Sequence, residues 1–132
     1  MLRIRNVQQT LDIFTVLGLK EVRRFDQPTG RFTLIFLTDR KGIFEIELTH
    51  NWDQETPYAI GDSFGHIAIG VENIYDTCKQ LQEMDVTIAR PPRDGYMAFV
   101  KTPDGISIEL LQQRPIGPPP KKWAEMENIG TW

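Results

Sequence analysis

Two short segments of the chain share one pattern of alternating apolar and polar residues. Residues 44–48 read Phe-Glu-Ile-Glu-Leu, and residues 106–110 read Ile-Ser-Ile-Glu-Leu. Successive side chains of a strand point to opposite faces of a sheet, so each segment predicts a strand with an apolar face and a polar face. The polar faces carry Glu45 and Glu47 in the first segment and Glu109 in the second. A carboxylate at the same place in two repeated units suggests a shared site.

The pattern of apolar positions predicts the same order of elements around each segment: a strand, a helix and three further strands. In the first half these are a strand at 2–7, a helix at 8–16, and strands at 21–25, 31–39 and 42–51. After a linker at 52–62 come a strand at 66–72, a helix at 74–84, and strands near 86–90, 96–102 and 106–112. Gly18 is the expected C-cap of the first helix, and Asn73 is the expected N-cap of the second. The sequence therefore predicts two βαβββ units.

The two units align when Asn6 is placed on Asn73, an offset of 67 residues. Alternation along the strand at 66–72 then predicts that His66 shares the polar face of its unit with Glu109. The same alternation predicts that Arg3 lies on the polar face of the first unit.

The length and composition of the chain allow one compact domain or two small units that share a core. The chain has 132 residues, of which 40% are hydrophobic. We expect a single domain at 1–114, with one module at about 1–52 and the other at about 63–114. Residues 115–132 form a Pro-rich tail that is expected to lie extended over a surface. Three large side chains predict that this tail is anchored on its own domain or on a neighbouring chain: Trp123, Met126 and Trp132.

Charge and apolar patterning argue against two classes of partner. The formal net charge of -3 removes the electrostatic attraction on which non-specific nucleic-acid binding depends. No apolar run approaches the roughly 18 residues that span a bilayer, and the first residues do not resemble a signal peptide, so we expect a cytoplasmic location without membrane contact. The single Cys78 cannot form an internal disulfide, and its place in the second helix predicts a packed residue.

Three residues on the predicted polar faces have the chemistry of metal ligands. Glu47, His66 and Glu109 offer carboxylate and imidazole groups, which bind divalent metal ions with water completing the shell. Each of these residues alone is more often structural, and Glu45 competes with Glu47 because both lie on one strand face. The repeat favours a metal site over a solvated strand edge.

Several segments of the chain together match one known family. They are Met-Leu-Arg-Ile-Arg-Asn-Val at 1–7, Leu-Gly-Leu at 17–19, Ile-Glu-Leu-Thr-His-Asn-Trp at 46–52, Phe-Gly-His-Ile-Ala at 64–68, Thr-Pro-Asp-Gly-Ile-Ser-Ile-Glu-Leu at 102–110, and the tail at 123–132. In these segments the chain resembles glyoxalase I (lactoylglutathione lyase) of the vicinal oxygen chelate superfamily, in its short proteobacterial form. This resemblance implies an α+β glyoxalase fold in which two βαβββ modules form cupped mixed sheets. It also implies a homodimer whose active sites are assembled between subunits.

The resemblance assigns a role to each candidate residue. Glu47 would bind the metal from one subunit, and His66 and Glu109 would bind it from the other. Glu109 would also be the catalytic base. Arg3 and Asn51 match positions that hold the glutathione moiety.

Two further arginines lie where related enzymes often place a cationic contact to the substrate. They are Arg90 and Arg93, just before the Asp-Gly pair at 94–95. A solvated turn is an equally good interpretation of this pair.

The implied reaction isomerises the hemithioacetal of methylglyoxal and glutathione to S-lactoylglutathione through a metal-stabilised enediolate. Glutathione is then a co-substrate, and each site needs one divalent metal ion. The short form favours Ni²⁺ or Co²⁺, with Zn²⁺ as the other choice, although the ligands suit all three ions.

One departure from the family pattern leaves a second interpretation open. Relatives carry His or Gln two residues before the Met-Leu-Arg segment, and the 67-residue offset places the counterpart of His66 at the same point, before Met1. Three protein ligands would then remain, which should weaken metal binding. The alternative is a non-catalytic binding protein of the same fold with a resistance or regulatory role.

Overall fold

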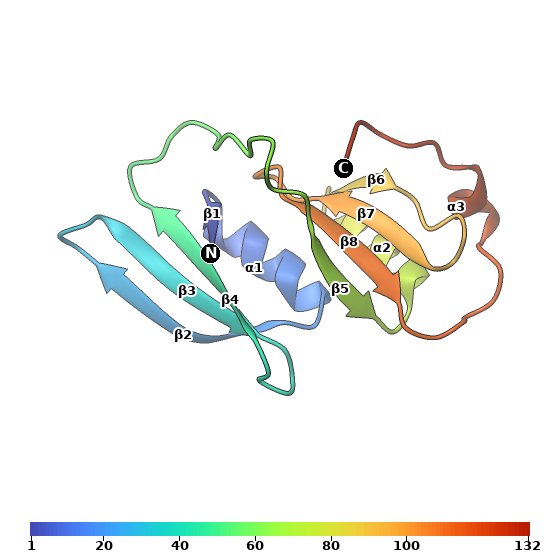
Figure 1. Ribbon diagram of the computed structural model, residues 1–132, viewed down its shortest axis with the longest axis horizontal. Coiled ribbons are helices and arrows are strands. Elements are labelled where there is room, and N and C mark those ends of the chain that lie inside the picture. The colour runs from blue at the N-terminus through green and yellow to red at the C-terminus, as the bar shows by residue number, and fades with distance from the viewer. The chain divides into compact units, whose positions relative to one another are not determined.

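Each half of the chain builds one four-stranded mixed sheet. The computed structural model describes residues 1–132 and divides them into two compact units, Met1–Ala59 and Ile60–Trp132. The first unit contains β1 (Leu2–Ile4), α1 (Val7–Val16), β2 (Lys20–Gln27), β3 (Phe32–Thr38) and β4 (Glu45–Asn51). The second contains β5 (Ile67–Val71), α2 (Ile74–Glu83), β6 (Thr87–Arg90), β7 (Met97–Lys101), β8 (Ser107–Gln112) and α3 (Lys121–Glu125). The predicted α+β fold with two βαβββ modules is confirmed (Figure 1).

The strand order is the same in both sheets. It is β1-β4-β3-β2 in the first unit and β5-β8-β7-β6 in the second, and only the first pair of each sheet is parallel. The register is repeated as well, because Phe36 pairs with Glu47 in the first sheet and Phe99 pairs with Glu109 in the second. The duplication seen in the sequence therefore extends to individual backbone pairs.

One face of each sheet carries the core. In the second unit α2 packs against β6, β7 and β8 (Figure 1). The buried residues of this helix include Ile74, Cys78 and Leu81. Cys78 on this helix is fully buried, as predicted, and burial raises the pKa of its thiol to about 12. Fully buried residues in the first unit include Ile4, Ile13, Phe14, Ile35 and Leu48. Because neighbouring side chains alternate, the opposite face of each sheet is left for polar residues and ligands.

Both α1 and α2 begin with an asparagine cap. The side chain of Asn6 accepts a hydrogen bond from the Gln9 N–H, and Asn73 caps α2 in the same way, as predicted. At the other end Gly18 has a φ of 86°, which lets the chain leave α1 in a left-handed turn.

Strand boundaries differ from the prediction where local signals compete. β1 ends at Ile4 rather than at residue 7, because Asn6 already caps the helix. β4 begins at Glu45 rather than at residue 42, and Phe44 is 45% exposed instead of joining the apolar face. Alternation alone therefore overestimated the length of both strands.

The C-terminal tail is anchored on its own unit. Trp123 in α3 is only 3% exposed, and the neighbouring Lys122 donates a hydrogen bond to Gln82 on α2. Further along, the Ile129 N–H donates a hydrogen bond of 2.8 Å to the Ala89 carbonyl at the edge of β6. Whether residues 1–114 form a single domain stays a prediction.

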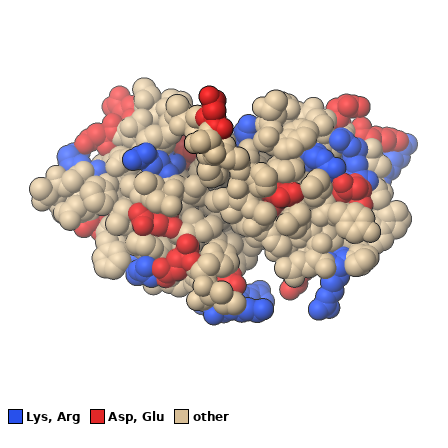
Figure 2. All heavy atoms as spheres, viewed as in Figure 1, with Lys and Arg blue, Asp and Glu red and all other residues tan.

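Surface charge is mixed, and no segment has the form of a membrane span. Acidic and basic side chains are interspersed over the face drawn in Figure 2. None of the helices combines the length and the apolar character that crossing a membrane requires.

Candidate metal and substrate site

His66 and Glu109 meet on the open face of the second sheet. Glu109 lies in β8 opposite Ala68 of β5, and His66 precedes Ala68 by two residues, so both side chains project from the same face. The His66 Nε2 atom lies 3.2 Å from the Glu109 Oε2 atom. The Glu109 side chain is 13% exposed and that of His66 is 41% exposed, so the carboxylate is sheltered while the imidazole is reachable. The expected shared face is thus observed.

Two aromatic rings lie next to the pair of His66 and Glu109. Phe99, the partner of Glu109 on β7, meets the His66 ring edge to face, with ring centroids 5.2 Å apart. Trp132 stacks on Phe99 at 5.6 Å. Sequence reasoning missed Phe99 as a site residue, although strand alternation around it could have placed it beside Glu109. It recognised Trp132 as an anchor but not where the side chain would lie.

Glu47 occupies the matching position on the first sheet. It lies in β4, is half-buried, and accepts a hydrogen bond of 3.4 Å from the Thr49 hydroxyl. Its competitor Glu45 is held by the two terminal guanidinium nitrogens of Arg23, and this hydrogen bonding lowers the pKa of the Glu45 carboxyl. Since no arginine or lysine pairs with Glu47, its oxygens are the better metal ligands of the two.

The donor set fits a divalent ion. Glu47 and Glu109 supply carboxylate oxygens that no arginine or lysine neutralises, and His66 supplies an imidazole nitrogen beside Glu109. Within either unit, no group of three or more His, Cys, Asp or Glu side chains is arranged to hold a metal ion. His66 and Glu109 are therefore the two candidate ligands that the second unit brings together.

The proposed glutathione contacts Arg3 and Asn51 lie on the same face as Glu47. Arg3 in β1 pairs with Thr49, and Asn51 follows Thr49 by two residues in β4. Arg3 is exposed. The Asn51 side-chain N–H donates a hydrogen bond of 2.9 Å to the Tyr58 hydroxyl, which fixes the orientation of the amide.

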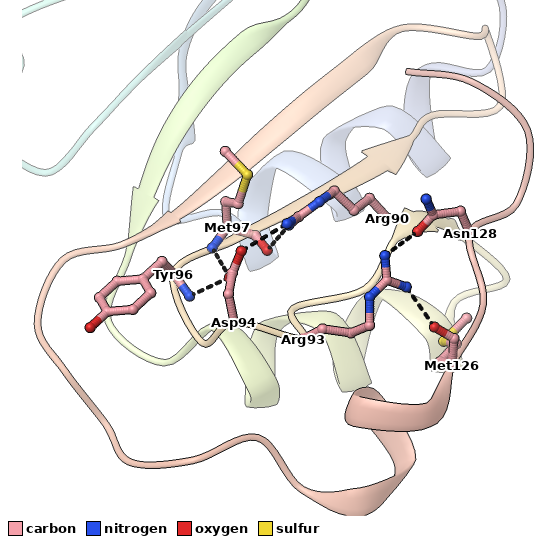
Figure 3. Close-up of polar contacts among 7 residues, drawn as sticks. All are labelled: Arg90, Arg93, Asp94, Tyr96, Met97, Met126 and Asn128. Atoms are coloured by element: carbon pink, nitrogen blue, oxygen red, sulfur yellow. Dashed lines mark hydrogen bonds and ion pairs between the residues drawn. The ribbon is translucent and has the colours of Figure 1, made fainter.

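Arg90 and Arg93 make contacts within their own unit (Figure 3). Arg90 donates hydrogen bonds to the Met97 carbonyl at 2.8 Å and to Asp94 at 2.7 Å. Burial acts to raise the pKa of Asp94, but the hydrogen bonds from Arg90 and from two backbone N–H groups outweigh it and lower that pKa.

Arg93 points away from Asp94 and toward the tail (Figure 3). It donates hydrogen bonds of 2.7 Å to the Met126 carbonyl and to the Asn128 side chain. Arg90 therefore stabilises a turn, and Arg93 holds the tail.

The family model of the Glyoxalase/Bleomycin resistance protein/Dioxygenase superfamily matches residues 1–110. The chain is 41% identical to "Lactoylglutathione lyase" of Neisseria meningitidis serogroup A over 122 residues, which cover 86% of this chain and 88% of that protein. It is 40% identical to "Probable lactoylglutathione lyase" of a Synechocystis species, over 85% of this chain and 91% of that protein.

Solved structures show the same relationship. The glyoxalase I of Leishmania major, described as trypanothione-dependent, matches with a TM-score of 0.76 and 35% identity over 86% of this chain and 84% of that chain. The glyoxalase I of Zea mays matches with a TM-score of 0.73 and 31% identity, over 84% of this chain and 42% of that chain. This chain therefore belongs to the Glyoxalase/Bleomycin resistance protein/Dioxygenase superfamily and, within it, to the glyoxalase I family.

Proposed function

We propose that this chain is a lactoylglutathione lyase that isomerises the hemithioacetal of methylglyoxal and glutathione to S-lactoylglutathione. The observation that carries the proposal is the contact between His66 and Glu109 on an open sheet face. It occurs in a chain that is 41% identical to "Lactoylglutathione lyase" of Neisseria meningitidis. This similarity favours the enzyme over a non-catalytic binding protein of the same fold.

The metal site is proposed to form between two copies of the chain. Glu47 of one protomer and His66 and Glu109 of the other would hold one divalent ion, with Ni²⁺ or Co²⁺ favoured and Zn²⁺ as the alternative. The similarity to lactoylglutathione lyases supports this arrangement, and each compact unit supplies candidate ligands, Glu47 in the first and His66 with Glu109 in the second. When bound, the ion would supply Lewis-acid stabilisation of negative charge on the substrate oxygens.

The lone buried Cys78, which cannot form a disulfide within the chain, supports a cytoplasmic location.

Glu109 is the proposed catalytic base. One of its carboxylate oxygens would take the proton from C1 of the hemithioacetal, and the electrons of the broken C–H bond would form the enediolate. The same carboxyl would then return the proton to C2, so the product is an isomer and no oxidant or reductant is needed. The sheltered position of Glu109 beside His66 supports this role, because a base must be held close to the proton that it moves.

Arg3 and Asn51 are the proposed glutathione contacts. The exposed guanidinium of Arg3 can offer paired N–H donors to a glutathione carboxylate. Because the Asn51 N–H group donates to Tyr58, the amide oxygen remains as an acceptor for a glutathione N–H. The internal contacts of Arg90 and Arg93 favour a structural role for those two residues over substrate binding.

The first prediction tests the activity and the base together. The purified chain, loaded in turn with Ni²⁺, Co²⁺ or Zn²⁺, should form S-lactoylglutathione from methylglyoxal and glutathione. The ultraviolet absorbance of the thioester product measures the rate. Glu109→Gln should lower kcat by about 10²- to 10⁴-fold, the usual contribution of a positioned general base. Glu83→Gln, at an exposed carboxylate on α2, is the matched control and should leave kcat unchanged.

Since the resemblance places a further ligand two residues before Met1, the assay includes a version extended N-terminally by His-Thr. Turnover by either version, lost on removal of metal with EDTA, supports the proposal. Failure of both versions with all three metals would refute it. Full turnover by Glu109→Gln would refute the assignment of the base.

A further inference from the structure

The last residues of the chain cross from one side of the second sheet to the other. This terminal strap, residues 126–132, is attached to the edge of β6 by the hydrogen bond from Ile129 to the Ala89 carbonyl. A register shift in the pairing of β6 with β7 falls at Ala89, between Ile88 and Arg90, so this carbonyl is available to the strap. Beyond it, Lys101 of β7 donates a hydrogen bond of 2.7 Å to the strap backbone. The strap therefore has a defined path from the edge of the sheet onto its open face.

The strap ends in an aromatic stack that leads to the candidate site. The rings of Trp132 and Phe99 are inclined by only 26°, with centroids 5.6 Å apart. The rings of Phe99 and His66 are perpendicular, with centroids 5.2 Å apart. Phe99 is 6% exposed although it lies on the open face, while Trp132 is 43% exposed. Trp132 is thus the outer layer that covers Phe99.

In the first unit an arginine covers the counterpart of Phe99. This counterpart is Phe36, and the guanidinium carbon of Arg23 lies 3.9 Å from its ring centroid. The corresponding residue beside Phe99 is Arg90, because both arginines pair with their phenylalanine just after a register shift. Arg90 is instead held by Asp94 and a backbone carbonyl. Trp132 therefore takes the place that an arginine fills in the other unit.

We propose that Trp132 is a positioning residue of the candidate site, which acts by holding Phe99 against the imidazole of His66. The His66 ring meets Phe99 edge to face, and in this orientation Nε2 faces Glu109. Groups that orient a metal-binding imidazole from outside the ligand shell contribute to metal affinity. The role of His66 as a ligand rests on the proposed function, whereas the orientation of its ring does not.

Three substitutions isolate the effect of the stack. Trp132→Ala removes the ring that covers Phe99, and Trp132→Phe restores a smaller ring. Ile129→Ala is the control within the strap, because its side chain is exposed and the backbone hydrogen bond to Ala89 is retained. Since Trp132 is partly exposed, the thermal unfolding midpoint should change little. If Trp132→Ala strongly lowers the thermal unfolding midpoint, Trp132→Leu replaces it as the test variant. Leucine keeps an apolar cover over Phe99 but has no aromatic ring.

The histidine ring protons give a readout that does not depend on turnover. The chain contains two histidines, so proton NMR of the metal-free protein resolves His66 with His50 as an internal control. The His66 ring protons lie beside the aromatic ring of Phe99, and a change in that ring's orientation shifts their signals. The second readout is Co²⁺ affinity, measured by calorimetry.

We expect Trp132→Ala to shift the His66 signals, leave those of His50 unchanged, and weaken Co²⁺ binding by about tenfold. Trp132→Phe and Ile129→Ala should resemble the parent chain in both measurements. Unchanged His66 signals in Trp132→Ala would overturn the inference, as would equal Co²⁺ affinity. A chain with no lyase activity whose His66 signals still respond to Trp132→Ala would refute the proposed function but leave the positioning role standing.

Discussion

At the scale of single residues, the two carboxylates of β4 differ in what surrounds them. Glu45 and Glu47 lie on one strand face, and alternation along the sequence cannot distinguish them. Arg23 holds Glu45 through its two terminal guanidinium nitrogens, while Glu47 accepts one long hydrogen bond from a threonine. A carboxylate that is already paired with an arginine binds a cation less well, so the neighbouring arginine decides between them.

Asp94 allows a prediction on pH dependence. Its pKa is lowered in the folded chain, so it stabilises the fold above the pKa of the unfolded chain, and this contribution is lost as the pH falls through the folded pKa. Asp94→Asn should lower the free energy of unfolding at pH 7 by less than about 1 kcal/mol, because the side chain is partly exposed. The difference between parent and variant should shrink below about pH 4, the ordinary pKa range of aspartate.

Urea unfolding at pH 7 and at pH 3 measures this difference. The exposed Asp62→Asn serves as the matched control for removing one carboxylate. A stability loss in Asp94→Asn that is equal at both pH values would contradict the proposed origin of the effect.

At the scale of elements, the two helices end in the same way with different residues. After α1 the N–H groups of Gly18 and Leu19 donate to the carbonyls of Thr15 and Phe14, and Gly18 adopts a φ of 86°. Asp85 takes the corresponding position after α2, with a φ of 60°. An L-residue other than glycine pays a steric cost in this conformation.

Exchanging the residues at these two positions should change stability in opposite directions. Asp85→Gly should raise the free energy of unfolding by about 0.5–1 kcal/mol, and Gly18→Asp should lower it by about 1 kcal/mol. Thermal unfolding of both variants beside the parent chain measures the change. Shifts of the same sign in both variants would show that the backbone conformation does not govern stability there.

At the scale of the whole molecule, the proposed site between subunits predicts complementation. Glu47→Gln and Glu109→Gln should each inactivate a homodimer. In a mixed dimer of the two variants, one site would contain both substitutions and the other would contain neither. An equal mixture refolded together should therefore recover about a quarter of the parent activity, since half of the dimers are mixed and each has one intact site.

The control for this experiment mixes the two variants without unfolding them, so that subunits do not exchange. Activity in the refolded mixture alone is the expected result, with dimers identified by light scattering. If ligands came from a single subunit, every site would retain one substitution and the refolded mixture would stay inactive.

The sequence by itself determined the features that depend on near neighbours in the chain. The two βαβββ units, the Asn73 cap and the polar faces carrying Glu47 and Glu109 follow from periodicity, capping chemistry and strand alternation. The placement of His66 on the same face as Glu109 also followed, because strand alternation put both residues on the polar face of the second unit. These signals are local, or are repeated at a fixed spacing, and can be read without coordinates.

The tertiary structure alone decided which distant groups became partners. Alternation could not show that Arg93 would hold the tail, that Arg90 would engage Asp94, or that Trp132 would cover Phe99. The contacts of Arg93 and Trp132 depend on the path of the tail around the edge of β6, where Ile129 donates a hydrogen bond to the Ala89 carbonyl. Arg90 instead engages Asp94 within a local turn. Such a path is set by packing and by backbone groups without partners, which have no period in the sequence. For that reason the candidate ligands could be proposed from the sequence, whereas the residues that contact them from the tail and from β7 required the structure.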